Sequence, residues 1–174
     1  MKILYLILLI LIGFSCNNKK VKTELTESKE RVENISDKIK DNESVLITNV
    51  ALNFINSYVE NCNKMSDRIG IIEWVSEQKN VTENFKAELN RLITESEKQD
   101  SELGLGFDPI FDSQDYPDNG FKLIKTNNKS NLITVIGKDL NDFKLNIKME
   151  LKNERWLVNG IGVINMAETE RVKR

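Results

Sequence analysis

The residues best suited to chemistry in this sequence are the carboxylates of one short stretch, residues 108–120. The stretch holds a series of acidic and amide side chains: Asp108, Asp112, Asp115, Asp118 and Asn119. Ca²⁺ prefers such oxygen ligands, but the gaps of four, three and three residues between the Asp residues do not match the alternating order of an EF-hand. Asp side chains in turns commonly accept hydrogen bonds from backbone amides instead. We therefore expect a turn-rich structural loop without a metal ion, and calcium binding is the alternative.

The same loop is also a candidate contact surface for a ligand or partner. If it forms the rim of an open sheet, Phe111 and Tyr116 would be available to a bound molecule. The full set of candidate residues is Asp108, Phe111, Asp112, Gln114, Asp115 and Tyr116. The expected occupant is an envelope protein or a small apolar ligand, bound at the mouth between the sheet and the helices, where concave pockets form in such shapes.

The composition argues against most kinds of catalysis. The chain contains no histidine, so it lacks the usual general base at neutral pH, the commonest metal ligand, and any Ser-His or Cys-His nucleophile. Cys62 lies in an apolar helical pattern and is predicted to be a small core residue. A carboxylate-dependent hydrolase or isomerase with an Asp base and a Tyr, such as Tyr58 or Tyr116, is the remaining enzymatic alternative. We predict no catalytic residue and no cofactor.

Length and charge restrict the remaining classes of protein. The 174 residues are enough for one domain of ordinary size, and 40% hydrophobic with 30% charged residues is typical of a globular chain. The formal net charge of -2 gives no basic face for nucleic acid.

The first sixteen residues resemble the export signal of bacterial lipoproteins. Lys2 precedes the apolar run 3–12, which as a helix would be roughly 15 Å long, half of the 30 Å or so of a bilayer core. The following Gly-Phe-Ser-Cys sequence, ending at Cys16, resembles a lipobox. The resemblance implies cleavage of a signal peptide, residues 1–15, and lipid on Cys16. A plain secretory signal is the alternative.

The lipoprotein interpretation carries expectations about place. Residues 16–43 are polar and would tether a domain to the membrane. Asn17 follows the cysteine and no acidic run lies behind it, so we expect the outer membrane of a Gram-negative envelope, facing the periplasm.

Helical periodicity dominates the first half of the domain. From Ser44 onward an apolar stripe predicts a long helix: Ile47, Ala51, Phe54, Ile55, Tyr58 and Cys62. A short second helix is expected around Trp74. The sequence from Asn80 to Glu83 reads as a capping box, with Asn80 as the N-cap of a helix that runs to about Lys98.

Strand periodicity replaces it after residue 120. Residues 143–152 alternate five apolar side chains with five polar ones, which predicts a strand with one buried face. Further strands are expected over 121–126, 132–137 and 155–164, joined by short turns. The pattern indicates an α+β domain, residues 44–166, with N-terminal helices packed on a curved antiparallel sheet of about four strands, followed by a polar tail, 167–174.

This order of elements resembles the cystatin-like fold shared with nuclear transport factor two. The ending from Trp156 to Asn165 is similar to the final strand of such domains, and the stretch from Leu103 to Pro117 resembles part of a family of small exported bacterial domains of unknown function. The resemblance covers residues 44–166 and implies a fold but no reaction, because members of this fold include enzymes, binding modules and structural proteins. No catalytic residue can be carried over from it. We therefore expect a membrane-anchored lipoprotein that carries a noncatalytic binding or interaction module.

Overall fold

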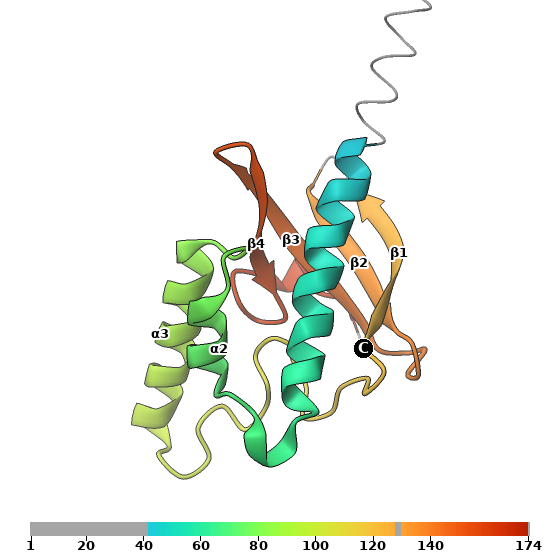
Figure 1. Cartoon of the computed structure of the whole chain (residues 1–174). Coiled ribbons are helices and arrows are strands. Elements are labelled where there is room, and N and C mark those ends of the chain that lie inside the picture. Colours follow the sequence, from blue (N-terminus) through green and yellow to red (C-terminus); the bar gives the residue numbers. More distant parts are fainter. Residues whose placement is uncertain (1–41, 128–129, 174) are drawn as a thin grey trace, which may run out of the picture. The chain divides into compact units, whose positions relative to one another are not determined.

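The computed structural model describes residues 42–127 and 130–173, and it confirms the α+β class. Three helices pack on a four-stranded antiparallel sheet (Figure 1). The predicted signal peptide, Cys16 and the tether up to residue 41 lie outside the described residues.

The sheet is a simple meander in which each strand pairs antiparallel with the next. Its strands are β1 (Phe121–Asn127), β2 (Leu132–Gly137), β3 (Lys144–Lys152) and β4 (Arg155–Ile161), in that order. Leu145, Ile147 and Met149 are buried, which confirms the apolar face of β3. Leu151 was predicted on the same face but is 51% exposed. The reason is that β2 begins at Leu132, which pairs with Lys148 of β3. Leu151 therefore lies in the part of β3 that pairs with β4 but extends beyond β2.

The last strand is shorter than predicted. β4 ends at Ile161 because Gly162 adopts a positive φ of 57° and turns the chain. Ile161 and Ile164 then exchange backbone hydrogen bonds at 3.0 and 2.9 Å. The turn lets the Val163 amide donate a hydrogen bond to the Pro109 carbonyl, at 3.0 Å. This contact joins the end of the sheet to the loop of residues 108–120.

The first helix, residues 42–62, buries the predicted stripe against the sheet. Its polar residues also contribute contacts. Asn56 accepts a hydrogen bond from the Phe121 amide at 2.7 Å and donates one to the Phe121 carbonyl at 3.2 Å. The Asn56 side chain therefore replaces a neighbouring strand at the start of β1, where the sheet has a free edge.

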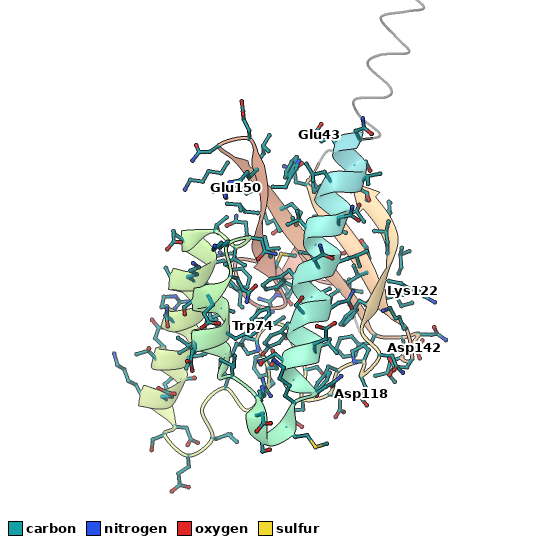
Figure 2. All side chains as sticks on the ribbon, viewed as in Figure 1. Glu43, Trp74, Asp118, Lys122, Asp142 and Glu150 are labelled. Carbon is teal, nitrogen blue, oxygen red and sulfur yellow. The ribbon has the colours of Figure 1, made fainter. Side chains whose placement is uncertain are left out.

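Two shorter helices, α2 (Ile71–Glu77) and α3 (Glu83–Gln99), pack beside the first helix. Trp74 on α2 lies on the side of that helix that faces the first helix (Figure 2). It is buried, and its ring lies 4.9 Å from that of Tyr58 on the first helix. The predicted capping box at Asn80 is wrong, because Thr82 is the N-cap and its hydroxyl accepts from the Phe85 amide. Residues 80–82 instead run extended beside β4, where Asn80 and Thr82 hydrogen-bond to the backbone of Val158.

The C-terminal segment packs on the polar face of the sheet. The short 3-10 helix Glu168–Glu170 follows the buried Met166, and the Lys148 ammonium lies 2.8 Å from the Glu170 carboxylate. Asn146 also donates to the Glu170 carbonyl at 2.7 Å. The folded domain therefore continues past the expected end at Met166.

Candidate functional site

One carboxylate, that of Asp108, organises the loop between α3 and β1. Its Oδ1 accepts hydrogen bonds from the amides of Ile110 and Phe111, at 2.9 and 3.2 Å. Its Oδ2 accepts from the Tyr58 hydroxyl at 2.5 Å and from Arg68 Nη2 at 3.3 Å. These four donors occupy the lone pairs of the carboxylate, so Asp108 acts as a fixed anchor for the loop.

Tyr58 stays protonated in this arrangement. Its side chain is fully buried, and this burial, together with the neighbouring charge of Asp108, raises the pKa of the phenol far above its ordinary value. Cys62 lies one helical turn away and is also buried, which raises the pKa of its thiol to about 11. Neither group is therefore an activated nucleophile at neutral pH.

Phe111 was predicted to be available to a ligand, and this prediction is wrong. Its side chain is 0% exposed. The ring lies 4.9 Å from that of Tyr116, 5.1 Å from that of Tyr58 and 6.3 Å from that of Phe121. Burial of a Phe side chain is favourable by roughly 1.5 to 3 kcal/mol, so the ring fixes the loop to the core and does not project from it.

The other predicted residues do not converge on one point. Asp115 and Gln114 are exposed, and the Gln114 amide donates to the Gly106 carbonyl at 2.9 Å. Asp112 lies at a positive φ of 53° on the turn, and Tyr116 is half-buried against Phe111. Of the predicted set, Asp108 and Gln114 line a common cavity.

That cavity is an open pocket of about 560 Å³ between the loop, α2 and the C-terminal half of α3. Arg68 lies on one wall with its side chain 38% exposed. Only Nη2 of Arg68 has hydrogen-bond partners among the described residues, which leaves Nε and Nη1 available. Much of the remaining lining is apolar: Ile71, Ile93, Leu103, Leu105, Phe107 and Pro109.

Most of these lining residues were missed by the sequence analysis. Two glycines with positive φ, Gly104 and Gly106, separate the apolar side chains of residues 103–107. Leu103 remains 69% exposed and Phe107 36% exposed. The sequence did contain a signal for this site, which is the alternation of large apolar residues with glycines in residues 103–107. Exposed apolar side chains that cluster on a protein surface commonly mark a binding site.

Neither a metal centre nor a membrane span occurs in the part of the chain that the structure describes. Across residues 42–127 and 130–173, no three acidic or thiol side chains gather as metal ligands would. None of the helices in the same ranges is long and apolar enough to span a bilayer.

Comparisons with known proteins do not assign this site. No protein-family model matches the chain, and searches of curated proteins and of solved structures give no match. The chemistry of the pocket therefore has to be argued from its own geometry.

Proposed function

We propose that this chain is a noncatalytic binding module of the cell envelope that takes a singly charged amphipathic anion in the pocket beside Arg68. A fatty-acid carboxylate is the simplest molecule of this class. The proposal is supported above all by one observation, which is the position of Arg68 on the wall of a partly apolar pocket of about 560 Å³, with its Nε and Nη1 free of hydrogen-bond partners among the described residues.

The lining matches both parts of such a ligand. Arg68 would hold the carboxylate by charge-assisted hydrogen bonds, while Ile93, Leu103 and Leu105 cover the apolar chain. Pockets for small ligands commonly measure about 300 to 1,000 Å³ and combine apolar walls with few polar groups. Glu97 and Asp108 also line the pocket, and their two carboxylates disfavour a second negative charge on the ligand.

The carboxylate-dependent enzyme is less well supported. Such an enzyme would use an Asp as the general base and a Tyr as a hydrogen-bond donor, and Asp108 does lie beside Tyr58. The oxygens of Asp108, however, already accept four hydrogen bonds. A general base needs a free lone pair directed at the substrate. Asp108 would have to release the loop before it could act.

Ligand titration tests the proposal. In calorimetry with the processed protein, dodecanoate should bind saturably, and dodecanol should bind about tenfold more weakly because it lacks the charge. Ser96→Trp should fill the pocket and abolish binding, since Ser96 lines it. Thr94→Trp is the matched control, because Thr94 lies on the exposed face of the same helix. Absence of dodecanoate binding, or equal binding by both tryptophan variants, would contradict the proposal.

The envelope location has its own test. We propose lipid attachment at Cys16, so Cys16→Ser should lose acyl labelling and leave the membrane fraction. Cys62→Ser keeps the proposed anchor and serves as the control. Retention of both label and membrane partitioning in Cys16→Ser would contradict the anchor, and cleavage by protease added to intact cells would contradict a periplasmic orientation.

A further inference from the structure

A second groove, with a different chemical character, opens at the other end of α2 and α3. Its volume is about 510 Å³, and it lies between the end of α2, the first turns of α3 and the β3–β4 hairpin. Its charged lining residues are Glu77, Lys79, Glu83, Lys86, Lys152 and Arg155. The Arg68 pocket instead involves α3 residues Ile93, Ser96 and Glu97, so the two sites are separate.

The groove has an excess of unpaired positive charge. Lys86 is neutralised by Glu83, whose carboxylate lies 3.2 Å from the ammonium group. Lys79, Lys152 and Arg155 make no ion pair within the described ranges. Only Glu77 remains to oppose them, although the chain as a whole has a formal net charge of -2.

Two of these cations are forced together by the hairpin. Lys152 and Arg155 are directly opposite each other in the β3–β4 pair. The turn between them places Asn153 and Glu154 at positive φ values of 49° and 61°. Like charges at opposed positions of a strand pair repel each other. A bound anion would remove this repulsion.

The groove also has room for the remainder of a ligand. A neighbouring hollow of about 490 Å³ shares Lys79 and Arg155 with it and continues to Trp156. The half-buried Trp156 side chain offers an apolar surface beside the two cations. A ligand with its anionic group between the cations can therefore extend an organic part toward Trp156.

We propose that this groove binds a phosphate ester, with the phosphate held by Lys79, Lys152 and Arg155. Three convergent cations match the charge and the several oxygen acceptors of a phosphate better than those of one carboxylate. The phosphate can belong to a lipid headgroup or to a soluble phosphorylated molecule. The proposal is independent of the Arg68 pocket, because no residue lines both sites.

Titration of the full processed protein with glycerol phosphate and with dihexanoyl phosphatidylglycerol, below its micelle concentration, tests the proposal and separates the two sources. Saturable binding with amide NMR shifts at residues 152–156 is expected for at least one probe. Tighter binding of the short-chain lipid, by about tenfold or more, indicates a lipid headgroup. Equal or tighter binding of glycerol phosphate indicates a soluble ligand.

Charge reversal supplies the matched control. The double variant Lys79→Glu with Arg155→Glu should weaken binding at least about tenfold, since it removes two of the three charged donors. Lys122→Glu with Lys125→Glu makes the same change of net charge on β1, and Lys122 lies on the opposite side of the domain from α2 and α3 (Figure 2). That control should bind normally. Equal loss in both double variants, or no saturable binding of either probe at low ionic strength, would overturn the proposal.

Discussion

The hydroxyl of Tyr58 donates a hydrogen bond to the carboxylate of Asp108 across 2.5 Å and so joins the first helix to the loop that follows α3. Tyr58 is fully buried, with its ring against those of Trp74 and Phe111. The Asp108 side chain is only 15% exposed, and a largely buried carboxylate that loses a donor bears an uncompensated desolvation cost. The pair therefore determines how firmly the loop beside the Arg68 pocket is held.

Tyr58→Phe should lower the free energy of unfolding by about 1 to 3 kcal/mol, because it removes the donor and keeps the ring. Urea denaturation measures the effect. Tyr116→Phe is the control, since the Tyr116 hydroxyl has no hydrogen-bond partner among the described residues, and we expect little change. Equal destabilisation by both variants would show that the hydrogen bond to Asp108 is not responsible.

Gly162→Ala should destabilise the domain on the order of 3 kcal/mol or more. Gly162 has a positive φ of 57°, and a Cβ there would lie 2.2 Å from the Pro109 carbonyl oxygen. At Gly70, by contrast, a Cβ would have no neighbouring atom within 4 Å, and φ is -58°. Gly70→Ala should therefore change the melting temperature little. A similar melting temperature for both variants would contradict the close approach of the β4 turn to the loop.

Cys62 should resist alkylation in the folded protein. Burial raises the pKa of its thiol to about 11, and little thiolate is available at pH 8. Iodoacetamide followed by mass spectrometry of the Cys62 peptide should show modification only after denaturant is added. Because the folded pKa is raised above the unfolded value, this group stabilises the fold fully below about pH 9 and loses that contribution between about pH 9 and pH 11. Rapid labelling of native protein at pH 8 would contradict the burial of the thiol.

The C-terminal segment should detach from the sheet in acid. The hydrogen bond from Lys148 lowers the pKa of Glu170, so the contact is fully present above the ordinary Glu pKa of about 4.3 and is lost as pH falls through the lower folded value. Glu170→Gln should produce the same detachment at neutral pH, seen as faster hydrogen exchange at residues 167–171. Glu168→Gln, at an exposed position in the same turn, should leave exchange unchanged. Equal exchange in the two variants would count against the Lys148 contact.

The amino-acid sequence by itself determined the secondary structure and the buried face of most elements. The stripe from Ile47 to Cys62 and the alternation of β3 each have the period of their backbone, and a side chain's face follows directly from that period. The short turns of the sheet made antiparallel pairing of neighbouring strands the economical topology. These features depend on residues close together in the chain, which is why they were predictable.

Only the tertiary structure decided where the chemically useful groups meet. Arg68 and Asp108 lie on different segments, and their contact depends on the path of the chain through α2 and α3. The N-cap moved from Asn80 to Thr82 because pairing with β4 keeps residues 80–82 extended. Phe111 is buried because the loop folds its ring onto Tyr58 and Phe121. Local periodicity carries no information about such contacts, because they join residues that are far apart in the sequence and meet only in the folded chain.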